Sequence, residues 1–545
     1  MSFNLADLIE HAVDATPQRA ALLSERGDQT FAELEDRANR LAHALAARGV
    51  GPGDKVGILS RNTVEAIEAM VAAFKLRAVM VNINYRYVTP EVVYLVNNSD
   101  MVALVCERRY LPVVAEAFDQ CPQLTSILVV DTDGPHDDTD PAGFERYEDV
   151  LVDQSGERDF AERSSDDIFM LYTGGTTGQP KGVMWRHEDA WRVFGGGMNL
   201  LTGEYLPDEY AQSRAGAAGD QVVRFPTPPL IHGAAQWAIL SSLFNCGAAV
   251  MLPDFDPHAI WRGVQQHRVN VMMITGDAMA RPLLDALAEG PAGGGRYDTS
   301  SLRALSSTAV LFSPTMQQRF VEWLPDCFIT DSMGASEAGF NGMNIIRAGH
   351  TPTQMSIRLD RTTAVLDENG RPVEPGSGDI GMLARSGHIA LGYYKDEKKT
   401  RETFREYDGV RYSIPGDLAR VETDGTVTVL GRGSTSINSG GEKIFPDEVE
   451  AAVRAHPDVV DALVLGVPDE QWGQRVAAIV VRAPGSEVGL ADLNRTARQH
   501  IAGYKVPRSV WFVDAIKRSP AGKSDLRWAR RLTEEQPSSE DQLVK

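Results

Sequence analysis

The segment from Leu171 to Gly182 contains the residue types that bind phosphate groups. Its glycines and hydroxyls, followed by a lysine, are Thr173, Gly174, Gly175, Thr176, Thr177, Gly178 and Lys181. Backbone N–H groups of glycines can approach phosphate oxygens closely, threonine hydroxyls donate further hydrogen bonds, and lysine supplies charge. The order differs from the P-loop of nucleoside triphosphatases, because Pro180 precedes the lysine and Gly182 follows it. The segment therefore predicts another kind of phosphate-binding loop, with a flexible turn between strands as the alternative.

The other candidate segments supply carboxylates, hydroxyls, cations and glycines rather than a nucleophilic triad. They are Pro228 to Gly233, Ser306 to Val310, Asp331 to Glu337, Tyr412 to Asp417 with Gly431 and Arg432, Ser439 to Glu450, and Ile516 to Lys523. Carboxylates accept hydrogen bonds or bind hard cations, and arginine is a permanently charged donor. This combination favours chemistry that depends on positioning and charge neutralisation.

These segments resemble motifs of the acyl-adenylate-forming enzymes and occur in the same order. The resemblance extends from about residue 8 to 530, and the family includes acyl-CoA synthetases, nonribosomal adenylation domains and firefly luciferase. Four details resemble actinobacterial ligases that act on steroid side-chain carboxylates: Gly174-Gly175, residues 183–186, Gly195 to Gly197, and residues 434–438. The resemblance implies an ATP-dependent, AMP-forming acid:CoA ligase that uses Mg²⁺ and coenzyme A. Such enzymes first form acyl-AMP and pyrophosphate, and then acyl-CoA and AMP.

The resemblance also implies roles for individual residues. The nucleotide-binding residues are those of the phosphate-binding loop together with Ser307, Thr308, Asp331, Ser332, Met333, Asp417 and Arg432. Ser336 is expected at the α-phosphate, Glu337 at Mg²⁺, and Lys523 at the charge that develops during adenylation. The chain departs from the family's usual pattern at Met333, where an aromatic residue is common, and at Ser336, where threonine is common. Without the neighbouring motifs, an acidic residue in an exposed loop would be an equally good interpretation of Glu337.

A further set of residues is expected along the path of the acyl group and CoA. It consists of His232, Gly334, Gly440, Gly441 and Lys443. Glycines there permit close approach of the thin pantetheine arm. His232 is predicted to be a gate or pocket residue, with a buried structural histidine as the alternative. The resemblance places the domain pivot at Ser434, where many relatives carry a charged residue, and a small polar residue is compatible with a hinge.

Helix and strand patterns alternate around these motifs. An apolar spacing of three and four from Phe31 to Leu45 predicts a helix, and strands at 56–59 and 78–81 flank a helix from Asn62 to about Lys75. This β-α-β order favours a parallel sheet with helices on its faces. Residues 131–166 and 203–221 are rich in turn formers and are predicted to be loops.

A change in composition near residue 432 predicts two domains, 1–432 and 433–545. Downstream of the small-residue run 431–436, Pro446 is expected to open a helix through Val453. Strands are predicted at 459–467, 476–481 and 510–513, a helix at 490–501, and a mobile tail after about residue 534. The predicted class is α/β, with a large N-terminal domain built of β-sheets with packed helices and a small mobile α+β C-terminal domain.

Composition limits the partners of the chain. The 545 residues carry 54 Lys and Arg against 75 Asp and Glu, a net charge of −21, which argues against general nucleic-acid binding. The four cysteines show no zinc or disulfide spacing, and from the residue pattern we expect neither a leader peptide nor a membrane-spanning run. We expect a cytoplasmic protein whose partners are small molecules, namely a carboxylic acid, ATP and CoA; a homodimer is left open.

The acyl substrate is predicted to be a bulky steroid side-chain carboxylate. Gly195 to Gly197 would leave open volume if they line the acyl channel, and such volume suits a rigid polycycle. The alternatives are that these glycines form an ordinary turn and that the acid is a medium-chain or long-chain fatty acid. Transfer to a carrier protein, luciferase-like oxidation and noncatalytic nucleotide binding are the other functions considered.

Overall fold

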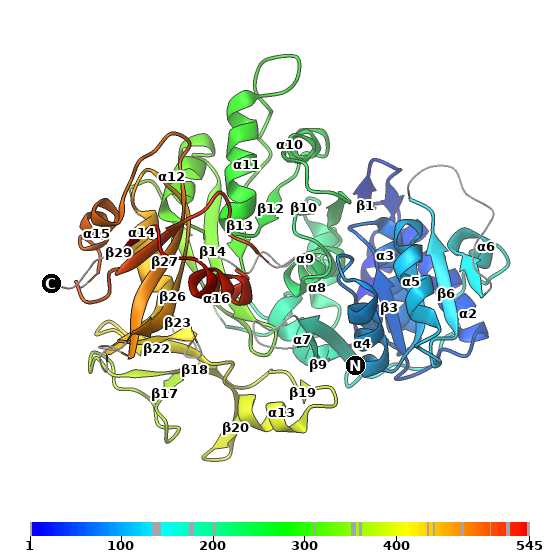
Figure 1. Cartoon of the computed structure of the whole chain (residues 1–545). Coiled ribbons are helices and arrows are strands. Elements are labelled where there is room, and N and C mark those ends of the chain that lie inside the picture. Colours follow the sequence, from blue (N-terminus) through cyan, green and yellow to red (C-terminus); the bar gives the residue numbers. More distant parts are fainter. Residues whose placement is uncertain are drawn as a thin grey trace.

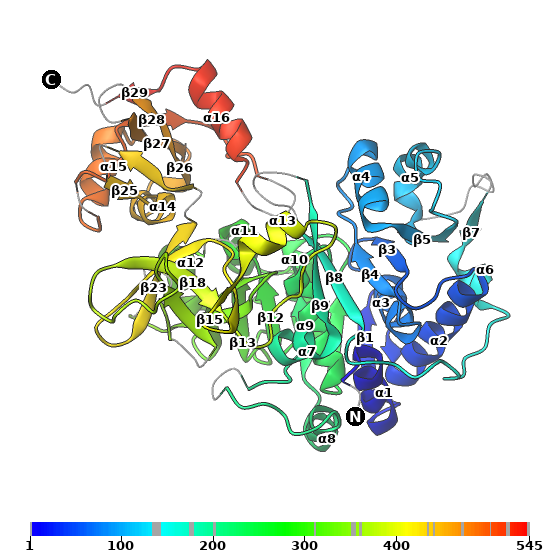
Figure 2. The same cartoon turned by 90° about the horizontal axis from the view of Figure 1, so that it is seen from below.

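The computed structural model describes most of the chain, in twelve segments. They are residues 3–132, 143–173, 179–199, 203–309, 312–349, 356–358, 362–432, 435–439, 442–469, 473–501, 503–518 and 524–541, without the side chains of residues 358, 432, 438, 442 and 443. Sheets and helices pack in layers, with a parallel sheet at one end of the molecule and a separate C-terminal unit at the other (Figures 1 and 2). The predicted α/β class, with a large N-terminal and a small C-terminal domain, is confirmed.

The N-terminal end of the molecule is a five-stranded parallel sheet covered by helices. In spatial order its strands are β4 (Val79–Asn82), β3 (Lys55–Leu59), β5 (Met101–Glu107), β6 (Ser126–Val130) and β7 (Phe144–Arg146). The helices of this region are α2 (Phe31–Ala47), α3 (Val64–Lys75), α4 (Thr89–Ser99), α5 (Leu111–Phe118) and α6 (Tyr147–Leu151), with a short 3₁₀ turn at Arg108–Tyr110. The predicted parallel pairing of the strands on either side of α3 is confirmed.

The centre of the molecule is an eight-stranded mixed sheet. In order its strands are β15 (Gly339–Ile346), β14 (Phe328–Ala335), β13 (Ala304–Thr308), β12 (Val271–Ile274), β10 (Val223–Pro226), β11 (Ala248–Met251), β1 (Ala20–Ser24) and β2 (Gln29–Thr30). The helices around it are α1 (Leu5–Ala15), α7 (His187–Phe194), α8 (Ala211–Ala218), α9 (Gly233–Phe244), α10 (Pro257–Gln266), α11 (Gly276–Glu289) and α12 (Pro314–Trp323). Side chains of α10, α11 and α12 form one buried cluster with β10 to β14.

Two smaller sheets complete the N-terminal part. The first contains β19 (Gly392–Tyr393), β9 (Lys181–Arg186) and β8 (Ile168–Thr173). The second contains β16 (Ser356–Arg358), β23 (Thr426–Arg432), β22 (Asp417–Val421), β18 (Ile380–Arg385), β21 (Val410–Ser413) and β20 (Phe404–Tyr407), with β17 (Thr363–Leu366) paired to β18. Helix α13 (Glu397–Thr403) follows β19.

The C-terminal unit has its own sheet and its own buried clusters. Its strands are β25 (Glu442–Ile444), β24 (Ile437–Ser439), β27 (Gly473–Arg482), β28 (Ser509–Phe512) and β29 (Glu540–Asp541), with β26 (Val459–Asp469) paired to β27. Its helices are α14 (Pro446–Arg454), α15 (Leu490–Ala497) and α16 (Leu526–Glu535). It meets the N-terminal part at α11, where Arg281 Nη2 donates to the Val460 carbonyl at 3.1 Å.

Local sequence explains helix α2 well. Its N-cap Thr30 accepts from the Glu33 N–H while the Glu33 carboxylate accepts from the Thr30 N–H, a reciprocal capping box. The apolar residues spaced at three and four from Phe31 to Leu45 are all buried, as predicted. Helix α3 begins one residue later than expected, because Thr63 rather than Asn62 caps it by accepting from the Ala66 N–H.

Several loop predictions were wrong. Residues 144–146 form β7 and 147–151 form α6 inside the first predicted loop, and α8 at 211–218 lies inside the second. The predicted helix at 490–501 ends at Ala497. After the strand predicted at 510–513 the chain forms α16 and then β29, so part of the predicted mobile tail after about residue 534 lies in regular structure. Most of these elements are short and show no clear helical or strand periodicity. The turn-forming residues around them therefore led to the prediction of loops. No helix in the described parts of the chain is long and apolar enough to span a membrane.

Candidate active site

The described residues on either side of the predicted phosphate-binding loop lie on two neighbouring strands. Strands β8 and β9 are antiparallel and Thr173 pairs with Lys181, so the ends of the loop are held together. The ammonium of Lys181 forms an ion pair with Asp396, which also caps α13 by accepting from the Lys399 N–H. The hydrogen bond from Lys181 is the main cause that lowers the pKa of Asp396. The ammonium of Lys181 is therefore held in place at the start of β9, just after the predicted loop.

Two predicted nucleotide-binding segments lie side by side on parallel strands. Residues 306–308 end β13, residues 331–333 are on β14, and Thr308 is in register with Ser332. The hydroxyl oxygens of Ser306 and Ser332 are 3.3 Å apart. Since ligands of α/β sheets bind beyond the carboxyl ends of parallel strands, this is the expected edge for a nucleotide.

The residues predicted at the α-phosphate and at Mg²⁺ follow β14 directly. Trp185 Nε1 donates to the Ser336 carbonyl at 2.8 Å, and the Tyr393 hydroxyl donates to Glu337 Oε1 at 2.7 Å. Trp185 lies on β9, and Tyr393 lies on β19, which pairs with β9. The sheet that carries Lys181 therefore also positions Ser336 and Glu337.

The donor set around Glu337 fits a magnesium ion held mainly by a nucleotide. Within the described residues, no group of three or more His, Cys, Asp or Glu side chains could hold a metal by itself. Mg²⁺ usually takes one or two carboxylates, several waters and substrate phosphates. The half-buried Glu337 carboxylate, with one oxygen hydrogen-bonded to Tyr393, would supply one such ligand.

The predicted ribose-binding pair occupies adjacent strands. Asp417 begins β22 and pairs with Arg432 at the end of β23, and the Asp417 side chain is buried. The Arg432 side chain lies outside the described parts. His232 is the residue before α9, is partly exposed, and makes no side-chain hydrogen bond to cap that helix. Its position at the start of α9 is compatible with both the gate and the structural interpretation.

Several predicted residues lie outside the described residues. They are Gly174, Gly175, Thr176, Thr177, Gly178, Ser434, Gly440, Gly441 and Lys523, and only the backbone of Lys443 is described, in β25. Gly334 lies at a register shift between β14 and β15, and a Cβ there would be 2.7 Å from the Gly339 carbonyl oxygen. Glycine at 334 therefore permits the two strands to close tightly.

The glycines at 195–197 do not leave open volume. A Cβ on Gly197 would lie 2.7 Å from ring atoms of the buried Trp191, and one on Gly196 would lie 2.7 Å from Gln212 Nε2. Trp191 Nε1 donates to Gln212 Oε1 at 2.9 Å, and Gln212 Nε2 donates to the Gly195 carbonyl at 2.9 Å. The glycines form a turn around a tryptophan, so the predicted channel volume at this place was wrong because neighbouring side chains fill it.

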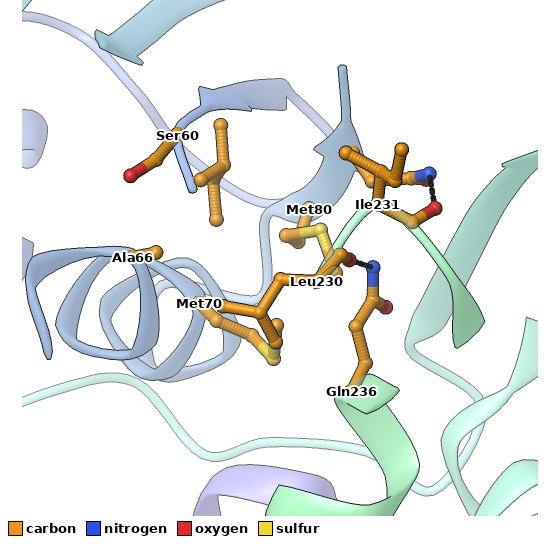
Figure 3. Close-up of a pocket in the computed structure, with 9 residues that line it drawn as sticks. Ser60, Ala66, Met70, Met80, Leu230, Ile231 and Gln236 are labelled. Atoms are coloured by element: carbon orange, nitrogen blue, oxygen red, sulfur yellow. Dashed lines mark hydrogen bonds between the residues drawn. The ribbon is translucent and has the colours of Figure 1, made fainter. Parts of the chain in front are cut away.

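A small cavity lies behind the loop that carries His232. It has a volume of about 10 Å³ and is lined by residues including Met70, Met80, Leu230 and Gln236 (Figure 3). Gln236 Nε2 donates to the Leu230 carbonyl, while its buried Oε1 has no hydrogen-bond partner within the described residues. This space suits one water molecule at most and is too small for an acyl group.

Asp331 should make the stability of the unliganded protein depend on pH. Burial, and then the charge of Asp277, raise the pKa of Asp331 to about 7. A carboxyl with a raised folded-state pKa contributes stability that is complete below its unfolded pKa and is lost as pH rises through the folded pKa. We expect Asp331→Asn to match wild type near pH 4 and to melt about 2–4 °C higher at pH 8. Thermal melts of both proteins at one scan rate, from pH 4 to pH 8, test this expectation. A difference in melting temperature that stays the same at every pH would contradict the raised pKa of Asp331.

The family models match both parts of the chain. Residues 9–394 match "AMP-binding enzyme", and residues 448–523 match "AMP-binding enzyme C-terminal domain". The chain belongs to the AMP-binding enzyme family. It is 58% identical to a 3-oxocholest-4-en-26-oate–CoA ligase of Rhodococcus rhodochrous, over 99% of this chain and 98% of that protein.

Two further comparisons agree over nearly the full length. The chain is 54% identical to a medium/long-chain-fatty-acid–CoA/3-oxocholest-4-en-26-oate–CoA ligase of Mycolicibacterium smegmatis, over 99% and 98% of the two chains. The crystal structure of ATP-bound MatB from Rhodopseudomonas palustris superposes with a TM-score of 0.80 at 26% identity, over 97% and 99% of the two chains. The expected resemblance to acyl-CoA synthetases of the steroid type is therefore confirmed.

Proposed function

We propose that the chain is an AMP-forming acid:CoA ligase whose preferred acid is a bulky steroid side-chain carboxylate. The observation that carries this proposal is the 58% identity, over the whole chain, to a relative named for 3-oxocholest-4-en-26-oate. The geometry of the site supports it, because Lys181, Ser336 and Glu337 are all positioned by one small sheet beside the ends of β13 and β14.

The reaction needs the carboxylate converted to a form with a good leaving group. A carboxylate oxygen attacks the α-phosphorus of ATP, pyrophosphate leaves, and the CoA sulfur then displaces AMP from the acyl carbon. Lys181 and the loop before it would hold the β- and γ-phosphates, Ser336 the α-phosphate, and Asp417 the ribose hydroxyls. A bound Mg²⁺, held by Glu337, would neutralise phosphate charge. Within this scheme the protein contributes mainly positioning and charge.

The C-terminal unit would serve both half-reactions in turn. Lys523 would enter the site for adenylation, and the glycines 440 and 441 with Lys443 would approach the pantetheine for thioester formation. We also propose that the chain divides into domains 1–432 and 433–545 and that the second domain rotates about Ser434. Support comes from strand pairing, since within the described residues the strands from Ile437 onward pair only with one another. Use of ATP and CoA is consistent with a cytoplasmic enzyme, and a homodimer is compatible with the scheme.

A fatty acid is the second candidate substrate. Relatives at 53–54% identity are named for both medium/long-chain fatty acids and the steroid acid. Physically, a site able to hold a rigid polycycle can also hold a flexible chain, although with less contact per atom. Transfer to a carrier protein keeps the same first half-reaction and differs only in the thiol that attacks the acyl-AMP.

A substrate series tests the proposal. We expect CoA-thioester formation to rank a C24 to C27 steroid acid first, palmitate and octanoate next, and acetate last, because a large pocket gives a small acid little binding energy with which to orient it. The comparison is of kcat/KM for each acid with saturating ATP and free CoA. Acetate as the best substrate would contradict the bulky acid, and acyl-AMP formation without any transfer to free CoA would favour a carrier protein.

A further inference from the structure

One face of the eight-stranded sheet is only partly covered. On the other face, α10, α11 and α12 bury the side chains of β10 to β14. The partly exposed apolar side chains of the uncovered face, which we call the open face, are Val271, Met273, Ala304, Met343 and Ile345. Within the described residues, none of them belongs to a buried cluster or is packed against one. Parallel strands are usually covered on both faces, so this row of apolar side chains lacks the cover that such strands normally have.

The open face runs from the nucleotide edge of the sheet toward β10. Ser306 and Ser332 lie on it, because side chains alternate along a strand. Leu305 is one residue before Ser306 and Ile329 is three residues before Ser332, and both lie in the opposite core. At the other end, Arg224 on β10 is in register with Val271, which is in register with Ala304. The strand register puts Arg224 about 13 Å back along the strands and about 14 Å across them from Ser332, a diagonal of about 20 Å.

Arg224 forms no ion pair with any of the described residues. Its neighbours Val223 and Phe225 pack into the core under α10, so Arg224 points to the opposite face, toward α9. Its Nη1 donates to Ser241 Oγ on α9 at 3.2 Å, and the described parts of the chain offer it no ion pair and no further hydrogen bond. Burial alone lowers the pKa of the Arg224 guanidinium. The Arg224 side chain is half-buried, and a guanidinium has five N–H donors, so one that makes a single bond to the described residues leaves donors available to a ligand.

We propose that the acyl group lies along the open face and that Arg224 donates hydrogen bonds to a ketone oxygen at the far end of a long rigid acid. This inference rests on the proposed function. The relatives are named for an acid that has its carboxylate and its ketone at opposite ends of a steroid skeleton. The open face offers the same arrangement, with the adenylation edge at one end, apolar side chains between, and an unmatched donor at the other.

Arg224 would thus determine specificity without touching the reacting atoms. An acid with the ketone would pair with the guanidinium, whereas an acid without it would cover the guanidinium and leave its donors unpaired. Sites built to hydrogen-bond a substrate group discriminate strongly against analogues that lack it. A fatty acid that covers the apolar row would gain no hydrogen bond from Arg224, so its turnover should not fall when an apolar side chain replaces the arginine.

The test compares wild type with Arg224→Met on three acids: a 3-oxo steroid side-chain acid, the same acid without the 3-oxo oxygen, and palmitate. We expect wild type to prefer the 3-oxo acid over the deoxygenated acid roughly tenfold or more in kcat/KM, and Arg224→Met to bring this ratio close to one. Palmitate turnover should not fall in Arg224→Met, because palmitate has no oxygen at that end to lose a hydrogen bond. Arg303→Met, the same change at an exposed residue just before β13, is the matched control and should keep the wild-type ratio.

The outcomes separate the two proposals. If wild type forms no CoA thioester from either steroid acid, the proposed function fails. If wild type uses both acids but Arg224→Met keeps the full preference for the 3-oxo acid, the role of Arg224 is overturned while the proposed function stands. Should Arg224→Met lack a cooperative melting transition, Arg224→Lys replaces it; its shorter, non-planar donor should reduce the ratio, and an unchanged ratio would overturn the inference equally.

Discussion

Replacing Lys523 with alanine should slow acyl-adenylate formation about a hundredfold or more and leave thioester formation from supplied acyl-adenylate nearly unchanged. The proposed role of this lysine is to neutralise charge at the α-phosphate and the carboxylate while pyrophosphate leaves. Loss of one preorganised contact of this kind costs about 3–4 kcal/mol of transition-state stabilisation. The lysine is on the C-terminal unit and would be withdrawn before CoA attacks, so only one half-reaction should depend on it.

Two half-reactions measured separately check this expectation. Acid-dependent exchange between ATP and pyrophosphate reports the first, and thioester formation from synthetic acyl-AMP and CoA reports the second. Lys517→Ala, which removes an exposed lysine of the same unit, is the matched control and should affect neither. Gly441→Leu should have the opposite pattern, with thioester formation lost and adenylation kept. Equal slowing of both half-reactions by Lys523→Ala would mean that the lysine acts through general binding or stability, and that the two-orientation scheme lacks its main support.

Replacing Glu337 with glutamine should also slow adenylation about a hundredfold or more, with a higher Mg²⁺ requirement. The change preserves shape and the hydrogen bond from the Tyr393 hydroxyl, but it removes the charge that the proposed ion needs. Adenylation rates across a Mg²⁺ titration measure the effect. Tyr393→Phe should produce a smaller loss of the same kind, because it frees the carboxylate without neutralising it.

A matched variant distinguishes this role from a structural one. Glu322→Gln makes the same chemical change at an exposed position on α12 and should leave the Mg²⁺ titration unchanged. Glu337→Gln should melt close to the wild-type temperature, since the residue is only half-buried. A Glu337→Gln enzyme with full activity and an unchanged Mg²⁺ requirement would exclude Glu337 as the metal ligand.

Sequence predicts best where neighbours along the chain determine the outcome. The spacing from Phe31 to Leu45 fixes which side of α2 is buried, and the β-α-β order around α3 fixes the parallel pairing of β3 and β4. The same order in the central sheet makes β13 and β14 parallel neighbours, so motifs near the carboxyl ends of these strands lie side by side, as residues 306–308 and 331–333 do.

The contacts that support the site were not predicted. The pairs Tyr393–Glu337, Trp185–Ser336 and Lys181–Asp396 join residues far apart in the chain, and each depends on how β9, β19 and β14 pack. No periodicity or motif marks such partners in advance. The glycines at 195–197 were misinterpreted for the same reason. Three glycines indicate free space only if no large side chain packs against them, and here Trp191 does.

The most direct test of the account follows an oxygen atom. The acid is supplied with ¹⁸O in its carboxylate, together with ATP, Mg²⁺ and CoA, and the products are analysed by mass spectrometry. If the carboxylate attacks the α-phosphorus and CoA then displaces AMP, one ¹⁸O must appear in AMP while pyrophosphate stays unlabelled. Label in inorganic phosphate together with ADP would show an acyl phosphate instead, and thioester formation without any label in AMP would contradict the acyl-adenylate mechanism for this chain.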